Sequence, residues 1–431
     1  MSDFKISTVW SPAKGNSEAD ATLCNLTIEV GGHVVTEFVD LHRQTVSKHL
    51  EVPAYYLAEW VAENWWPLLW EPRKSEDDSD SPEFLARHSF LTAQHGFALP
   101  KVLIVALGRL LQVSSSARDV PLADVRFRRG GSASCVREDV EAELSAFVTS
   151  VLARLEAAGV RSTYLHDAWS VVKETDAEEA QFCKFVGALG RSPYEVDDAT
   201  AALIERLLPT LGERLLMDLC LVSPAQTFPI IAEMAEKAAE LTKYASLSTL
   251  SPLASLKLPH DNISVPAYRR GVNAAQRVKQ RLGISETDPR GATRVFEALK
   301  IDTSARAGST WTNDEIAITG AVVREETDMK VALLQPTESK RRFAAARAIF
   351  SGWSAELPNE SRLLTSAVTR DQQANRAFAA ELTAPRALIK KHAQRGRLSP
   401  SAIFELAADL QIGADVVSKQ AVNNGVEVFR A

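Results

Sequence analysis

Side chains that could take part in catalysis or metal binding are sparse along this chain of 431 residues. It has no GxxxxGK[ST] phosphate loop, no GxSxG nucleophile turn and no GxGxxG after a strand. His88 and His95 are seven residues apart and could share one helix face, but the segment offers no third ligand. We therefore expect both to be ordinary side chains. The remaining candidates lie between Lys340 and Lys391.

Apolar side chains recur at helical spacing in both halves of that stretch. In the first half these residues are Phe343, Ala346, Ile349, Phe350 and Trp353. In the second half they are Ala374, Ala377, Phe378, Leu382 and Leu388, with Pro385 interrupting the pattern. The spacing predicts two amphipathic helices.

These two helices resemble those of the ImmA/IrrE family of zinc metallopeptidases. That family has an RFxxAHExxH helix, followed by a helix with the pattern acidic-x-x-AN-x-FA-x-x-LL-x-P. Arg342, Phe343 and Ala346 match the first helix. The second is matched, with one extra residue after Asn375, by Ala374, Asn375, Phe378, Ala379, Leu382 and Pro385. The resemblance covers about residues 266–431 and leaves residues 1–265 outside it.

The resemblance places degenerate residues at the catalytic positions. The first metal histidine falls at Arg347, the general base at Ala348 and the second histidine at Ser351, with the acidic ligand at or near Asp371. Two histidines one turn apart bind zinc through imidazole lone pairs, which an arginine side chain lacks. Losing a general base alone slows a reaction about a hundred- to ten-thousand-fold. We therefore expect a peptidase-like fold with no metal, no cofactor and no activity.

One hypothesis concerns the guanidinium that takes the place of the metal. Arg347 could form an ion pair with Asp371 or Glu381. Such a salt bridge would replace the metal as the link between the two helices.

The whole chain predicts an α+β fold that is mainly helical. Residues 1–136 are expected to form an α+β module with a Trp-rich helix, and residues 137–250 a helical middle domain. The Ser- and Pro-rich stretch 246–266 marks the best domain boundary. Residues 266–431 would then form the domain that resembles ImmA/IrrE.

The N-terminal module contains a tryptophan cluster as its main candidate for partner binding. Gly31-Gly32 suits a hairpin turn, and Pro53 begins a helix that runs to Trp70. Along that helix, Trp60, Trp65, Trp66 and Trp70 form a wide apolar face. This face is either a packed core or domain interface, or a groove for a ligand or partner.

A basic turn further along the chain is a candidate anion site. Arg126, Arg128 and Arg129 precede Gly130-Gly131, whose backbone N–H groups could hold a phosphate. A charged hairpin tip explains the same residues equally well.

Composition limits the remaining functions. The net charge of −6 argues against a protein that binds nucleic acid over its whole surface. The N-terminus lacks the pattern of a signal peptide, and no apolar run is long enough to span a membrane. The four cysteines are scattered without a CxxC pair, so we expect reduced thiols in a cytoplasmic protein.

Three functional hypotheses follow. The first is a non-catalytic regulator or scaffold that binds a protein partner; the resemblance implies phage defence, toxin–antitoxin or mobile-element and stress regulation. The second is a surviving metallopeptidase acting on a repressor, with displaced ligands such as Asp371 and His392. The third is a DNA-binding regulator, because residues 398–425 have helix–turn–helix spacing. The second helix of that motif has Lys419 as its one cation, whereas DNA binding normally needs several.

Overall fold

The structure, a computed structural model, describes residues 3–12, 15–74, 81–259, 261–304, 317–355 and 357–429. Helices predominate over strands in these residues, which confirms the α+β, mainly helical fold class. None of the described helices is long and apolar enough to cross a membrane.

The chain separates into two compact units, residues 1–201 and 202–431. This division differs from the three domains predicted from the sequence. The helices expected to form a middle domain are shared between the units, because residues 140–183 contribute to the core of the first unit. Helix α9 (Phe228–Tyr244) instead packs on a sheet of the second unit.

The first unit contains three antiparallel sheets among its described residues. The first sheet comprises β1 (Phe4–Trp10), β2 (Leu23–Val30), β3 (His33–Val34) and β6 (Leu50–Pro53). The second comprises β4 (Phe38–Asp40), β5 (Thr45–Ser47), β9 (Arg118–Val120) and β10 (Val125–Phe127). The third comprises β7 (Lys101–Leu107), β8 (Leu110–Ser116) and β11 (Gly131–Val136). The predicted turn at Gly31-Gly32 joins β2 to β3, and both glycines have the positive φ that such a turn requires.

Helices pack on these sheets and most of them contribute to one continuous core, whereas Phe84 packs on Leu103 and Val105 in a small separate cluster. The helices are α1 (Glu18–Ala21), α2 (Tyr55–Glu63), α3 (Trp65–Trp70), α4 (Pro82–His88), α5 (Arg137–Ala157), α6 (Tyr164–Glu174) and α7 (Ala177–Ala188). The single helix expected from Pro53 to Trp70 is divided at Asn64 into α2 and α3. Pro67 accounts for this division, because its nitrogen cannot donate a hydrogen bond to the preceding turn.

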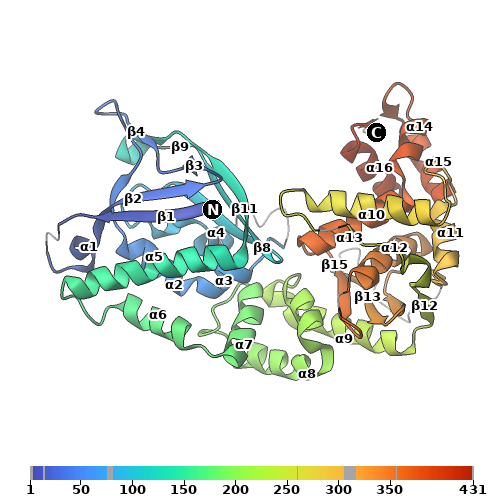
Figure 1. Cartoon of the computed structure of the whole chain (residues 1–431), viewed down its shortest axis with the longest axis horizontal. Helices are drawn as coiled ribbons and strands as arrows, with labels where there is room; N and C mark the ends of the chain where they lie inside the picture. The colour runs from blue at the N-terminus through green and yellow to red at the C-terminus, as the bar shows by residue number, and fades with distance from the viewer. Residues whose placement is uncertain are drawn as a thin grey trace. The chain divides into compact units, whose positions relative to one another are not determined.

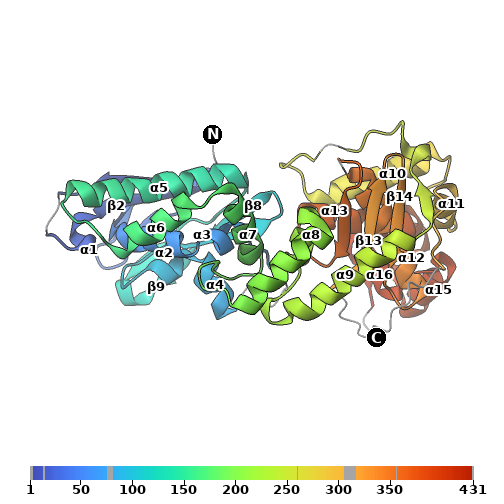
Figure 2. The same cartoon turned by 90° about the horizontal axis from the view of Figure 1, so that it is seen from below.

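The second unit is built around a four-stranded antiparallel sheet. Its strand order is β12 (Leu247–Thr249), β14 (Asp328–Leu333), β13 (Ile318–Glu325) and β15 (Ser361–Thr365). Helix α9 crosses one face of this sheet (Figure 2). Helix α12 (Glu338–Ser354) packs on β13, β14 and β15, where Gly352 lies against the Val322 and Met329 side chains.

Two more helices complete this layer beside α12. Helix α13 (Arg370–Thr383) packs against both α12 and α10 (Ala267–Arg281), which lies along it in Figure 1. The side chains of Thr337 and Thr369 accept backbone N–H bonds at the first turns of α12 and α13, and so fix where these helices begin. A Cβ atom at Gly271 would collide with the α13 backbone at Ala374, so α10 and α13 approach too closely for any other residue there. The short helix α11 (Gly291–Ala298) adds apolar side chains to the same core.

The C-terminal helices have a small core of their own. They are α14 (Arg386–His392), α15 (Pro400–Leu410) and α16 (Ala414–Asn423). The short strand β16 (Arg397–Leu398), between α14 and α15, pairs in parallel with β17 (Glu427–Val428), which follows α16. Helix α15 ends at Gln411, which is left-handed, and this turn sets α16 against α14 and α13.

A buried ion pair attaches α8 (Asp198–Cys220) to the sheet of the second unit. The Asp218 carboxylate accepts two hydrogen bonds from the Arg362 guanidinium of β15, at 2.8 and 3.2 Å, and one from the Leu363 backbone N–H. Helix α8 breaks at Gly212, three residues after Pro209, where the backbone φ is +75°. Asp218 therefore ties the part of α8 after this break to β15.

Candidate functional site

Arg347 lies in the interface between α12, α13 and the sheet, and only 3% of its surface is exposed. Its guanidinium donates to Asn375 Oδ1 at 2.9 Å and to Gln372 Oε1 at 2.7 Å, both on α13. It also donates to Thr319 Oγ1 at 3.1 Å and to the Thr365 carbonyl at 2.6 Å. A single side chain thus connects two helices and two strands.

The other two positions of the degenerate motif lie beside Arg347 on the same helix. Ala348 is completely buried, and the Ser351 hydroxyl accepts a hydrogen bond from Asn375 Nδ2 at 3.2 Å. Neither side chain offers a strong metal ligand or a base, and both are enclosed by packing. The cluster of Arg347, Ser351, Gln372 and Asn375 is therefore a closed hydrogen-bond network.

The predicted ion pair between Arg347 and Asp371 or Glu381 is wrong. Asp371 faces α10 instead, where it lies 3.2 Å from Arg270. Adjacent residues on a helix point about 100° apart, so the position that reaches Arg347 is Gln372, one residue further along. Glu381 pairs with Arg386 at 3.8 Å and accepts from Gln420 at 3.2 Å.

Burial and a neighbouring cation act on Arg347 in the same direction. Removal from water lowers the pKa of its guanidinium, and nearby Arg376 lowers it further, to about 9. The group is still cationic at neutral pH. Among the described residues, no carboxylate forms an ion pair with either arginine.

The outer edge of β15 is occupied by side chains of the same unit. Leu363 N–H donates to Asp218, and Leu363 C=O accepts from Gln372 Nε2 at 2.8 Å. Thr365 N–H donates to Gln372 Oε1 at 3.3 Å, and its carbonyl accepts from Arg347 and Arg376. A peptide cannot add to this edge as another strand unless it breaks these bonds.

A cavity of about 1060 Å³ lies next to this network. Helices α10, α12, α13 and α16 contribute most of its walls, and Thr319 belongs to both the cavity and the network. Apolar contacts come from side chains such as Val272 and Phe343. Charged lining residues are five cations and two carboxylates: Arg269, Lys340, Arg376, Arg386 and Lys419, with Glu381 and Asp415.

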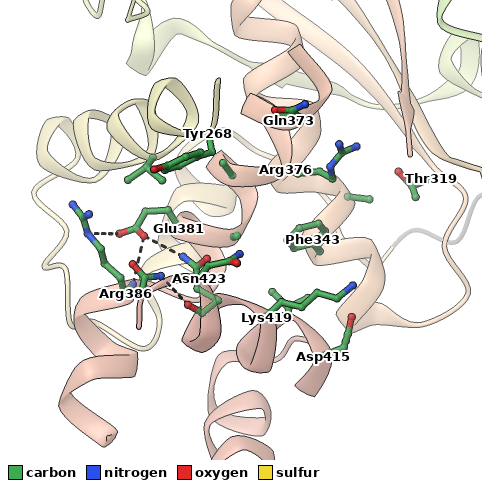
Figure 3. Close-up of a pocket in the computed structure, with 18 of the residues that line it drawn as sticks. Tyr268, Thr319, Phe343, Gln373, Arg376, Glu381, Arg386, Asp415, Lys419 and Asn423 are labelled. Carbon is green, nitrogen blue, oxygen red and sulfur yellow. Dashed lines mark hydrogen bonds and ion pairs between the residues drawn. The ribbon is translucent and has the colours of Figure 1, made fainter. Parts of the chain in front are cut away.

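The two sides of this cavity differ in chemistry. Figure 3 shows Arg376, Lys419 and Thr319 on one side of Phe343. On the other side, Glu381 faces Arg386 and Gln420, close to Asn423. Burial raises the pKa of Glu381, opposed by Lys279 and Arg386, and its Oε1 has no hydrogen bond from the described residues.

The tryptophans predicted as partner-binding candidates are mostly core residues. Trp60, Trp65 and Trp66 are at most 7% exposed, and Trp70 is partly exposed. Trp65 packs edge-on against Trp169, Trp60 donates to the Ala86 carbonyl, and Trp66 donates to the Tyr194 hydroxyl. The Arg137 guanidinium covers the Trp70 ring, 3.6 Å from its centroid. This placement agrees with the alternative of a packed core.

Each arginine of the candidate anion site has a carboxylate neighbour. Arg126 forms a bidentate pair with Asp119, while Arg128 and Arg129 lie 3.7 and 3.1 Å from the same Glu37 carboxylate. Two of the three charges are therefore compensated within the protein. Arg128, Arg129 and Gly130 link β10 of the second sheet to β11 of the third, so this turn is neither the tip of a hairpin nor an open anion site.

His88, which the sequence marked as ordinary, belongs to a buried polar cluster of the first unit. Its Nε2 lies 3.0 Å from Glu71 Oε2, and its Nδ1 lies 2.7 Å from the Ile104 carbonyl. Arg87 makes a bidentate pair with the same Glu71 carboxylate. Burial alone would raise the pKa of Glu71, but the hydrogen bonds from His88 and Arg87 lower it to about 2.

The residues considered for a displaced metal site and for DNA binding have other partners in the structure. No three His, Cys, Asp or Glu side chains of the described residues are grouped to hold a metal ion, and His392 Nδ1 contacts the Leu388 carbonyl. Helix α16 has Lys419 on the face that lines the cavity. The four cysteines are buried and are not joined by disulfides.

Comparisons with protein-family models, with curated proteins and with solved structures gave no significant match. The resemblance to ImmA/IrrE thus rests on the residues quoted for it and stays a prediction. Gln372 and Arg376 were not predicted as site residues from the sequence. Their spacing of four residues, with Asn375 between them, indicates that the three side chains share one helix face.

Proposed function

We propose that this protein is a non-catalytic regulator or scaffold whose C-terminal unit binds a polypeptide partner in the cavity beside Arg347. The main support is the position of Arg347, where a permanent cation fills the space between α12 and α13 that the resemblance assigns to a metal. A closed network of neutral acceptors leaves no base or ligand for hydrolysis there. The adjacent cavity offers the concave, partly apolar surface that a binding function needs.

The proposal includes the setting that the resemblance implies: a cytoplasmic protein of phage defence, toxin–antitoxin or mobile-element and stress regulation. Four buried cysteines without a disulfide are compatible with a reducing compartment. The two alternatives have less support. A displaced metal site lacks a group of donors in the described residues, and α16 offers one lysine for DNA phosphates.

Site-specific photo-crosslinking in the native cell tests the proposal. A photoreactive phenylalanine at position 343 lies inside the cavity, whereas one at exposed Phe404 on α15 provides the matched control. We expect a discrete crosslinked polypeptide from position 343 and none from position 404. Absence of a polypeptide product at position 343, or the same products from both positions, would refute partner binding in the cavity. Stoichiometric zinc in the purified protein would favour the peptidase instead.

A further inference from the structure

The buried and partly buried arginines of this unit are of two kinds. Arg362, Arg370 and Arg270 each pair with an aspartate, at 2.8, 2.6 and 3.2 Å. Arg347 and Arg376 contact neutral oxygens instead, as do Arg341 and Arg342 of α12, and no described carboxylate forms an ion pair with any of these four. Removing a guanidinium from water is unfavourable unless an opposite charge compensates it. Of these four, Arg376 is the one that lines the cavity, where an anion from outside the unit would supply the missing counter-charge.

The guanidinium of Arg376 is held in place but keeps donors for such an anion. Its Nη1 donates to the Thr365 and Ala367 carbonyls, at 3.3 and 3.0 Å, which fixes the orientation of the guanidinium. Its Nε and Nη2 donors make no hydrogen bond to described residues, and its side chain lines the cavity. A guanidinium presents its donors in a fork that matches the two oxygens of a carboxylate or phosphate.

Lys419 provides a second cation from a different element. It extends from α16 on the same side of Phe343 as Arg376 (Figure 3). The side chain is exposed and forms no ion pair with a described residue, including Asp415 one turn earlier on α16. Two cations from separate helices thus line the same partly apolar cavity.

We propose that the cavity recognises an oxyanion, a carboxylate or a phosphate, held between Arg376 and Lys419. The inference rests on the proposed function and makes the partner's bound segment an acidic one. Phe343 and Val272 would contact the apolar part of the ligand. The amide side chains near Glu381, those of Gln420, Asn423 and Asn424, would form the remaining hydrogen bonds with the ligand.

Matched peptides and pyrophosphate provide the test. Heptapeptides are synthesised in pairs that differ only by Glu or Gln at the central position, and binding to the full chain is measured by fluorescence polarisation. Pyrophosphate binding is measured by calorimetry. The variants are Arg376→Gln and Lys419→Gln, with Lys391→Gln as the control for net charge, because Lys391 is exposed on α14 outside the cavity lining. Lys419 has no hydrogen bond or ion pair to a described residue, so Lys419→Gln should fold normally even if Arg376→Gln does not.

We expect the Glu peptides to bind about tenfold more tightly than their Gln partners, the size expected for one charge-assisted hydrogen bond. Lys391→Gln should retain this preference, and Lys419→Gln and Arg376→Gln should lose it. Pyrophosphate binding without peptide binding, lost in the same variants, would support the oxyanion site and refute the polypeptide partner. Equal binding of Glu and Gln peptides without pyrophosphate binding would overturn the oxyanion site and leave the partner proposal standing. An equal loss in Lys391→Gln, or no binding of any probe, would also overturn it.

Discussion

Replacing Arg347 by alanine should destabilise the second unit substantially. The substitution removes four hydrogen bonds and leaves a void in a fully packed interface. Thr365 C=O and Gln372 Oε1 keep other donors, but Asn375 Oδ1 loses its only described one. One unsatisfied buried acceptor is worth about 1–3 kcal/mol, and truncation of a large buried side chain about 2–5 kcal/mol. Removing a buried charge that has no counter-charge is favourable and offsets part of this cost. We therefore expect the second unit to lose about 3–5 kcal/mol of stability.

A second substitution separates the loss of volume from the loss of charge. Arg347→Met retains most of the side-chain volume and removes the cation, so we expect a loss below about 2 kcal/mol. The matched surface control is Lys391→Ala. A chain with two compact units need not unfold in one transition. Hydrogen exchange of peptides from α12 and α13 is therefore the appropriate measurement, since it reports the local opening free energy.

Two outcomes would contradict the role of Arg347 as a link between α12 and α13 or the energies expected of it. If Arg347→Ala changes the opening free energy of α12 and α13 by less than about 1 kcal/mol, Arg347 does not link these helices. If Arg347→Met is as destabilising as Arg347→Ala, the hydrogen bonds matter more than the volume and the charge penalty is small.

Three further predictions concern packing and charge elsewhere. Gly271→Ala should destabilise the α10–α13 contact by about 1–3 kcal/mol or more, measured by urea denaturation against the exposed control Gln280→Ala. Asp218→Ala should cost about 3–5 kcal/mol, because it leaves the guanidinium in β15 buried without its closest carboxylate, whereas Glu213→Ala on the same helix should be nearly neutral. The pKa of Glu71 is lower in the folded state than in the unfolded state, so its contribution is complete above about pH 4.5 and is lost as the pH falls toward 2. Glu71→Gln should therefore flatten the decline of the urea midpoint between pH 5 and 3, and an unchanged decline would contradict this assignment.

Local sequence signals predicted the helices and turns of this protein well. The repeat of apolar residues in 340–353 corresponds to α12, and the Gly31-Gly32 turn joins β2 to β3. Such features depend on residues within one or two turns of each other, so a single stretch of sequence contains the information. The sequence alone also determined that Arg347, Ala348 and Ser351 cannot supply two zinc ligands and a base.

Only the tertiary structure decided which partners these residues meet. Gln372, rather than Asp371, faces Arg347, because the rotation of α13 is set by its packing on α10 and α12. The sequence of the Trp-rich segment is the same whether its apolar face is buried or exposed. The face is buried because Trp169, from a helix distant in the sequence, packs against Trp65. Arg376 and Lys419 are 43 positions apart, so their convergence on one cavity depends on how the C-terminal helices fold back onto α13. Pairing between distant segments is a property of packing, and no local pattern encodes it.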